Sequence, residues 1–400
     1  MAAGSETLGQ APLGQAPMGQ APLGNGFVRR EQIEPAPPPA LVSGPIAWVR
    51  ANLVSSIPNA LLTLFALALL WLIVPGLVRF LFVDAVWTGA NRDACRAEVV
   101  GRPVGACWAF VWDKLNYFIY GSYPIAQRWR VDVWFAMLAA GVGWLLWLKA
   151  PRRDLGALYF FVVFPVVSYF LLTGLEVVGL EHVPTSLWGG MLVTLVVATV
   201  GIVVSLPLGV ALALARRSKL PIMKFAAVVF IEFVRGVPLI TVLFMANVML
   251  PLFLPGDVSI DRLLRPLVGV AIFASAYMAE VIRGGLQAMP KGQYEGAQSL
   301  GLGYWQMMGL IVLPQALRIV IPGIVNTFIG LFKDTSLVSI VGIFDFVRTI
   351  ESSRVDPTWA APTVNVTTYA FAAMFYFVFC FGMSRYSLMV ERRLATGYKR

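Results

Sequence analysis

Histidine and cysteine are scarce in this sequence: the chain of 400 residues has one histidine, His182, and three cysteines, Cys95, Cys107 and Cys380. Metal sites built on imidazole or thiolate need clusters of these side chains, so such a site is not expected. The phosphate-binding pattern G-x-x-x-x-G-K-[ST] is also missing, so this chain is not expected to bind ATP in that way. With no plausible Cys–His pair either, a membrane enzyme has little support.

Charge is scarce as well, at 13% of residues against 58% hydrophobic residues. A soluble protein of this length carries more charge to stay in solution. Several uncharged stretches exceed the roughly 18 residues that suggest a membrane-spanning helix. These stretches are 51–78, 155–175, 183–215, 236–256 and 357–384. The sequence therefore predicts an all-α membrane protein that crosses the bilayer several times.

We expect about eight transmembrane helices. Their predicted ranges are 54–82, 131–148, 155–175, 189–215, 222–252, 265–283, 315–333 and 363–387. Gly236 and Pro238 should interrupt the fifth, because neither residue suits a helix interior. A broken or re-entrant segment should continue the seventh to about residue 350.

Residues 1–45 differ in composition from the rest. They contain LGQAPLGQAPMGQAPLG and EPAPPPA, which are rich in small, flexible and helix-breaking residues. Such segments cannot bury a core, so we predict a disordered cytoplasmic tail. An N-terminal extension of three helices should then occupy 46–180, and the main transmembrane domain 181–400.

The basic residues set the expected orientation. The net charge of +10 fits a membrane protein with Lys and Arg in its cytoplasmic loops, and no basic block is interleaved with aromatics as nucleic-acid binding would require. With an even number of spans, both termini should be cytoplasmic. The hydrophilic loop at about 85–130 should then face the periplasm. Cys95 and Cys107 could form a disulfide in that oxidising compartment, or remain free thiols.

The segment YEGAQSLGLGYWQMMGLIVLPQAL (294–317) lies between the sixth and seventh predicted spans. Residues 294–300 can form two helical turns, and Gly301 suits the left-handed position that ends a helix. Tyr304 can restart the helix after Gly303. We expect a short helix on the cytoplasmic face, which suits docking of a partner, although an ordinary interhelical loop is the alternative.

This segment resembles the E-A-A loop of permease subunits of ATP-binding-cassette (ABC) importers. That family has Glu-Ala-Ala, three residues, Gly, nine residues and Ile-x-Leu-Pro. The chain matches it at Glu295, Ala297, Gly301, Ile311, Leu313 and Pro314, and it departs at Gly296, where the family prefers alanine. The loop 291–314 is therefore expected to be the site of coupling to an ATPase.

Further stretches resemble polar amino-acid uptake permeases, namely EFVRGVPLITVLF (232–244), YMAEVIRGGLQAMPKGQYEGA (277–297) and LFKDTSLVSIVGI (331–343). The resemblance implies a five-helix core of type I ABC importers. The N-terminal half is similar to membrane subunits of general L-amino-acid and glutamate/glutamine/aspartate/asparagine importers.

The resemblance also implies the rest of a transporter in the bacterial inner membrane. A dimeric cytoplasmic ATPase would bind ATP and Mg, a second related permease subunit would complete the channel, and a periplasmic binding protein would deliver the amino acid. This chain itself would hold no cofactor and catalyse no covalent step.

Charges inside the predicted spans are costly unless they are paired or face water. Glu232 and Arg235, three residues apart on one helix face, count to about 12 and 16 Å from Lys224. Lys333 and Asp334 count to about 22 Å from Arg318.

These four charges could pair to hold broken helices together, or they could contact the carboxylate and ammonium groups of an amino acid. Thr241 and Asn247 are further polar candidates for the substrate pathway, with contacts between helices as the alternative. Glu280 and Arg283 are expected to anchor the cytoplasmic end of their helix. An ion-coupled secondary transporter that uses Glu232 or Asp334 is the rival function.

Overall fold

The computed structural model describes residues 44–147, 149–253, 255 and 260–395. These residues are almost entirely helical, and β-structure among them is confined to isolated bridges. Nearly all of the predicted tail, residues 1–43, lies outside the described residues. Contacts divide the chain into two compact units, Met1–Val74 and Pro75–Arg400.

The first unit contains α1 (Pro45–Asn52) and most of α2 (Ile57–Val78). Proline at the first position of α1 suits a helix start, because its missing N–H would have no partner there. The Thr63 hydroxyl donates a hydrogen bond of 2.7 Å to the Leu53 carbonyl and thereby fastens the turn between the two helices.

Eight segments could cross a membrane: seven long apolar helices and one bent pair. They are Ile57–Val83, Ile125–Leu146, Arg153–Thr173, Gly190–Arg216, Leu264–Ala288, Ile321–Val341, Pro362–Leu394 and the pair Pro221–Gly236 with Leu239–Phe253. The prediction of an all-α protein with about eight spans is confirmed for the described residues, while the side on which each terminus lies stays a prediction.

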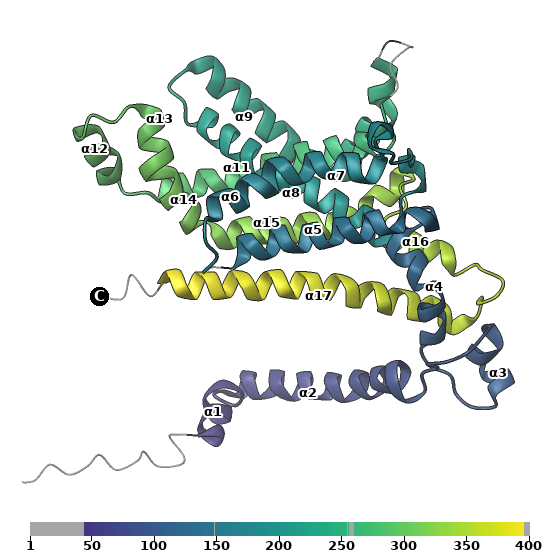
Figure 1. The fold of residues 1–400 in the computed structure, drawn as a ribbon. Coiled ribbons are helices and arrows are strands. Elements are labelled where there is room, and N and C mark those ends of the chain that lie inside the picture. The colour runs from purple at the N-terminus through teal and green to yellow at the C-terminus, as the bar shows by residue number, and fades with distance from the viewer. Residues whose placement is uncertain (1–43, 148, 254, 256–259, 396–400) are drawn as a thin grey trace, which may run out of the picture. The chain divides into compact units, whose positions relative to one another are not determined.

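Figure 1 shows the order of the helices. In the second unit they are α3 (Ala97–Val100), α4 (Trp108–Tyr120), α5 (Arg128–Leu146), α6 (Arg153–Leu158), α7 (Phe164–Thr173), α8 (Gly190–Arg216), α9 (Pro221–Gly236), α10 (Leu239–Phe244), α11 (Leu264–Ala288), α12 (Lys291–Ser299), α13 (Tyr304–Gln306), α14 (Leu313–Ile319), α15 (Ile321–Asp334), α16 (Phe346–Ser353) and α17 (Pro362–Ala395).

The most extensive packing in the second unit joins α8 to α11. Small residues allow this close approach: a Cβ added at Gly209 would lie 2.8 Å from the Cβ of Met278. Helices in a membrane associate through such close packing, since burial of apolar surface drives them little there. α5 packs on α7, and α4 packs on α8 and α16. These contacts join helices on both sides of residue 180, and the predicted division of the chain there stays a prediction.

The fifth predicted span is bent by 104° between Gly236 and Leu239. Pro238 has no backbone N–H to continue the ladder of α9, and its extended conformation starts α10 in a new direction. The predicted interruption is thus present at the predicted residues.

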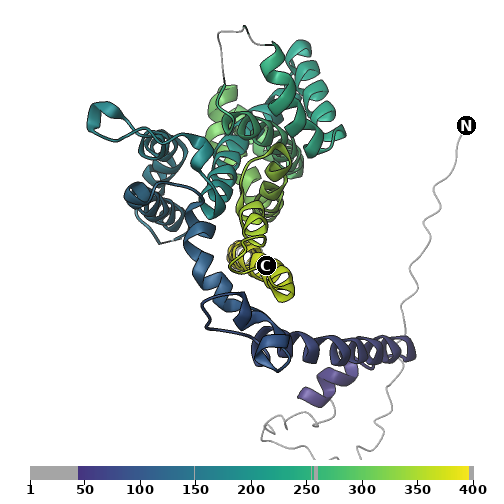
Figure 2. The ribbon, with the colours of Figure 1, turned by 90° about the vertical axis from the view of Figure 1, so that its right-hand side faces the viewer.

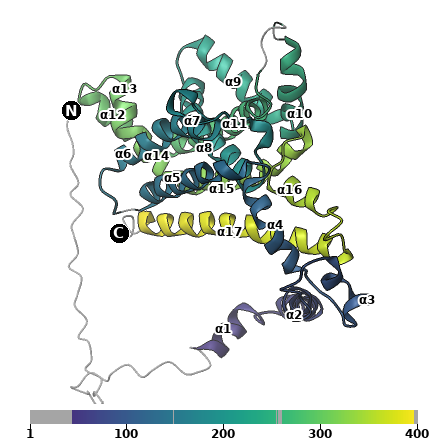
Figure 3. The ribbon, with the colours of Figure 1, turned by 45° about the vertical axis from the view of Figure 1, so that its right-hand side comes forward.

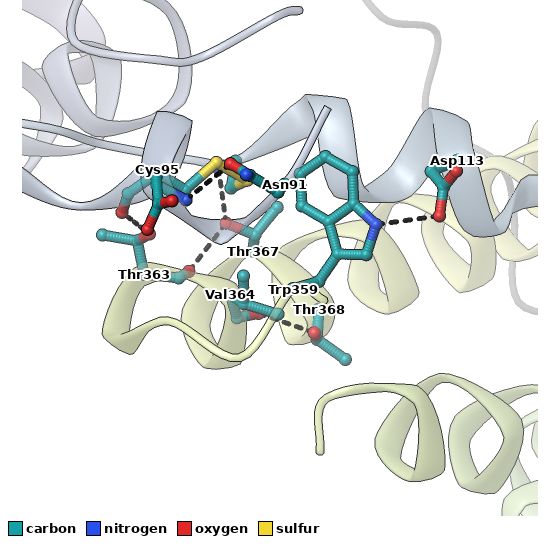
Figure 4. The surroundings of a disulfide bond; sticks show 10 residues. Asn91, Cys95, Asp113, Trp359, Thr363, Val364, Thr367 and Thr368 are labelled. Atoms are coloured by element: carbon teal, nitrogen blue, oxygen red, sulfur yellow. Dashed lines mark hydrogen bonds between the residues drawn. A yellow bond between two sulfur atoms is a disulfide. The ribbon is translucent and has the colours of Figure 1, made fainter. Parts of the chain in front are cut away.

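The segment with Cys95 and Cys107 folds against the start of α17, and Figure 2 views the second unit from this end. The structure joins the two cysteines in a disulfide with a Cα–Cα distance of 5.7 Å. In Figure 4, Thr367 Oγ1 accepts a 2.8 Å hydrogen bond from the Cys107 N–H, and Thr363 donates one to the Cys95 carbonyl. The loop at 85–130 therefore contacts α16 and α17 of its own chain.

Two polar contacts reinforce this packing. The Trp359 indole N–H donates a 2.8 Å hydrogen bond to Asp113 (Figure 4), and Lys114 forms an ion pair of 2.6 Å with Asp356. The hydrogen bond from Lys114 lowers the pKa of Asp356 below its usual range. Both contacts hold α4 to the turn that precedes α17.

Candidate functional site

The predicted docking segment contains a short helix that ends at a glycine. α12 stops at Ser299, and Gly301 has a φ of +72°, the left-handed conformation that closes a helix. The Gly301 N–H donates to the Gln298 carbonyl at 2.9 Å, and the Leu302 N–H donates to the Ala297 carbonyl at 3.3 Å. The chain restarts as α13 at Tyr304, continues as a π-helical turn (Met307–Val312) and enters α14 at Leu313.

One side of this segment is anchored in a hydrophobic cluster. Ala297 is 2% exposed, and it packs in the cluster with residues of α8 and α11. The buried members of the cluster are Ala213, Met278, Ile282, Leu286, Met289, Ala297, Met307, Met308, Val312 and Ala316. The matched motif residues Leu313 and Pro314 lie where the chain turns into α14, and Leu313 packs against the same cluster.

The other side presents large apolar side chains that nothing in the described chain covers. Leu300 is 76% exposed and Trp305 is 75% exposed, and Tyr304 is also exposed. Glu295 and Gly296 lie on the exposed side of α12. We call the surface formed by Glu295, Leu300, Tyr304 and Trp305 the α12–α13 surface. Figure 3 shows that it lies at the opposite end of the second unit from α3 and α16.

Tyr294 ties α12 to the ends of two long helices. Its hydroxyl donates a 3.1 Å hydrogen bond to the Leu286 carbonyl of α11. Arg217, directly after α8, donates to the same hydroxyl at 3.2 Å, and its guanidinium lies 5.7 Å from the ring centroid. A force applied to α12 would therefore act on α8 and α11 through polar contacts as well as through the hydrophobic cluster.

Five charged residues form an ionic cluster near the same end. Arg216, Glu232, Arg235, Glu280 and Arg283 come from α8, α9 and α11. Glu280 lies at its centre: its carboxylate is 2.9 Å from Arg216, 2.8 Å from Arg283 and 3.7 Å from Arg235. Arg216 also pairs with Glu232 at 2.8 Å. The cluster thus joins three helices, including the half of the bent span that precedes the break.

The ionic cluster shows the surroundings of the charged residues that were predicted within the spans. Glu232 contacts Arg216, the last residue of α8, so it lies level with that end of α8. Glu280 is mostly buried, with 14% of its side chain exposed, and its three partners come from α8, α9 and α11. Anchoring of the cytoplasmic end of α11 by Glu280 and Arg283 stays a prediction.

The other four candidates for the substrate pathway lie outside the ionic cluster. Lys333 and Asp334 end α15, and they form no ion pair with other residues in the described ranges. Thr241 is exposed on α10. The Asn247 carbonyl accepts a 3.2 Å hydrogen bond from Arg265, while its side-chain oxygen is buried without a partner among the described residues. Two of the six candidates belong to the ionic cluster and the other four do not, and the role of all six stays a prediction.

A buried carboxylate outside the spans was not anticipated. Asp345 is fully buried and caps α16 by accepting hydrogen bonds from the Val347 and Arg348 N–H groups at 3.0 and 3.1 Å. Burial raises the pKa of Asp345 to about 7, and these backbone hydrogen bonds lower it only in part. Its position before a helix start was the one signal available in the sequence.

Comparison with known proteins identifies the family. The family described as "Binding-protein-dependent transport system inner membrane component" matches residues 205–396. The inner membrane amino-acid ABC transporter permease protein YhdY of Escherichia coli is 49% identical over 352 residues, which cover 88% of this chain and 94% of that protein. The glutamate/glutamine/aspartate/asparagine transport system permease protein BztC of Rhodobacter capsulatus is 38% identical over 436 residues. This match covers 93% of this chain and 99% of that protein.

Among solved structures, an amino acid ABC transporter is 30% identical with a TM-score of 0.45, and the match covers 51% of this chain and 92% of that one. The relatives are inner-membrane permeases, and the spans of this chain agree with a multi-pass protein of the inner membrane. From the similarity along nearly the whole chain, this protein belongs to the family of amino-acid ABC transporter permeases.

Proposed function

We propose that this chain imports polar L-amino acids from the periplasm into the cytoplasm together with a second, related permease subunit. A periplasmic binding protein delivers the amino acid, and a separate ATPase dimer binds ATP and Mg and performs the hydrolysis. The substrate class is supported by BztC, whose name gives glutamate, glutamine, aspartate and asparagine.

The α12–α13 surface carries the proposal for the ATPase. Leu300 and Trp305 are large apolar residues left uncovered at the end of a membrane protein, next to a helix that is packed firmly from behind. Exposed apolar side chains rimmed by polar ones are typical of protein–protein interfaces. Glu295, Gly296, Ala297 and Gly301 shape this surface, and Leu313 and Pro314 return the chain to the membrane.

The mechanism follows from the contacts behind the surface. When the ATPase closes on ATP, it displaces α12. Tyr294 and the hydrophobic cluster transmit this displacement to the ends of α8 and α11. The ionic cluster around Glu280 carries α9 with them, so these helices move together and open the pathway to alternate sides.

Lys333 and Asp334 are the better candidates for contact with the amino acid. Glu232 and Arg235 are engaged in the ionic cluster, whereas Lys333 is exposed and Asp334 is half-buried. A Lys333→Gln variant should therefore raise the KM for uptake, while Arg318→Gln, at an exposed position of α14, should leave it unchanged.

Reconstitution of the complete importer in proteoliposomes tests the coupling role. Gly301→Asp places a side chain at a φ of +72°, a backbone conformation that residues other than glycine adopt much less readily. It also adds charge beside Leu300. We expect both uptake and transport-coupled ATP hydrolysis to fall.

Gly296→Ala is the matched control. Gly296 is helical with open space around its Cα, and alanine favours a helix by about 1 kcal/mol over glycine. That variant should transport normally. Normal uptake and normal coupled hydrolysis by Gly301→Asp would contradict the coupling role.

A further inference from the structure

A cavity of about 360 Å³ lies in the half of the second unit away from the α12–α13 surface. It is enclosed by α5, α7, the loop before α8, the first half of α8 and the start of α11. Its size falls within the roughly 300–1,000 Å³ of small-molecule sites. In Figures 1 and 3 these helices run alongside one another.

The wall of the cavity is mainly apolar, but it includes polar groups with no partner. Trp134 Nε1, Ser168 Oγ and Trp188 Nε1 are buried and have no hydrogen-bond partner among the described residues. Trp134 is 1% exposed and Trp188 is 6% exposed. Buried donors without acceptors cost about 1–3 kcal/mol each, and a small turn of these side chains toward the cavity would let a ligand with acceptor oxygens relieve this cost.

The ionisable groups at the cavity do not suit an amino acid. Asp261 and His182 line it, and Tyr169 is neutral at physiological pH. One Asp261 oxygen accepts the Thr185 hydroxyl at 2.6 Å, and the other accepts the N–H groups of Leu263 and Leu264 at 2.8 and 3.2 Å. Among the residues that the structure describes, no lysine or arginine lines the cavity to receive a carboxylate.

We propose that this cavity binds a phospholipid of the surrounding bilayer. The acyl chain fills the apolar part between α7 and α8, and the ester and headgroup oxygens accept hydrogen bonds from the indole and hydroxyl donors. Bilayer lipid has direct access, because Tyr169 lines the cavity and is itself 63% exposed. The lipid then acts as a filler that joins the N-terminal helices α5 and α7 to α8.

Photo-crosslinking tests the proposal on the unmodified protein. The complete transporter is reconstituted in vesicles of phosphatidylethanolamine and phosphatidylglycerol that contain a trace of a phospholipid with a diazirine in its acyl chain. After illumination, mass spectrometry should find label concentrated on peptides of α5, α7 and the first half of α8. Equal labelling of α17, whose middle carries exposed apolar residues, would overturn the proposal.

A matched pair of variants supplies the second test. Ser168→Trp fills the cavity, whereas Val167→Trp adds the same side chain at a neighbouring exposed residue that does not line it. Ser168→Trp should lose the concentrated label and the co-purified phospholipid, and Val167→Trp should keep both. If Ser168→Cys instead forms cross-links to the partner permease and the unmodified complex takes no label, a protein segment fills the cavity and the proposal is wrong.

Discussion

The ionic cluster offers a quantitative test, because its central residue can lose its charge with almost no change in shape. Glu280→Gln keeps the length of the side chain but removes the negative charge shared by Arg216, Arg235 and Arg283. Glu232 is then the one acid left in the cluster, and it contacts Arg216 alone of the three.

The magnitude follows from burial. Removing one partner of a fully buried ion pair costs about 3–5 kcal/mol, since it leaves an unpaired charge. Glu280 is 14% exposed, but the three guanidinium groups are 20–34% exposed, so water screens part of the loss. We therefore expect Glu280→Gln to lower the free energy of unfolding by about 2–4 kcal/mol. A shift of about 2–5 °C in Tm would follow for a chain of this size.

Glu232→Gln is the matched control, because that side chain is 55% exposed and has a single partner. Exposed pairs contribute about 0.2–1 kcal/mol, so its Tm should change little. The two variants are compared by heating each protein in detergent and measuring by size-exclusion chromatography how much folded protein is recovered. High salt should erase the small effect of Glu232→Gln and leave most of the effect of Glu280→Gln. Equal losses in the two variants would refute the central role of Glu280.

Three further predictions concern the end of the molecule that carries α4 and α16. Replacing Cys95 and Cys107 by serine, or adding a reductant, should destabilise the 85–130 segment by about 2–4 kcal/mol and expose it to added protease; unchanged cleavage would contradict this. Burial raises the pKa of Asp345, so the folded state favours its protonated form; this contribution to stability is complete below about pH 4 and is lost as pH rises through about 7. The Tm should therefore fall between about pH 5 and pH 8, and Asp345→Asn should flatten that fall. An equal slope in the variant and the unmodified protein would contradict the burial argument. Trp359→Phe removes the hydrogen bond to Asp113 and should lower the free energy of unfolding by about 1 kcal/mol, with a small fall in Tm. A much larger fall in Tm would mean that the packing of the indole, and not its hydrogen bond, stabilises this contact.

The spans and the break in the fifth one could be predicted because they depend on local sequence. Long uncharged stretches have few alternatives to crossing a bilayer, and Pro238 interrupts a helix wherever it stands. The same holds for the docking segment, where Gly301 ends α12 by its own conformation and Tyr304 restarts the helix. Each of these features depends on residues that are consecutive in the sequence.

The ionic cluster could not be predicted in the same way. Arg216 and Glu280 are far apart in sequence and meet because α8 packs along α11, which follows from small residues such as Gly209. The spacing of Glu232 and Arg235 correctly placed both on one helix face, but it gave no information about which helices that face contacts. Counting residues from Lys224 gave a distance along α9, but it could not show where α8 and α11 meet that helix.

The positions of these features explain how a push at the surface could reach the channel. α12 is fixed to α8 and α11 by Tyr294 and Ala297, and Glu280 fixes α9 to both a little further along. Beyond the cluster, the next irregular point of α9 is the bend at Gly236 and Pro238, where a Cβ at Gly236 would meet nothing within 4 Å. A rigid group of helices next to an open bend concentrates motion at the bend. Displacement of α12 should therefore change the angle between α9 and α10 more than it deforms either helix.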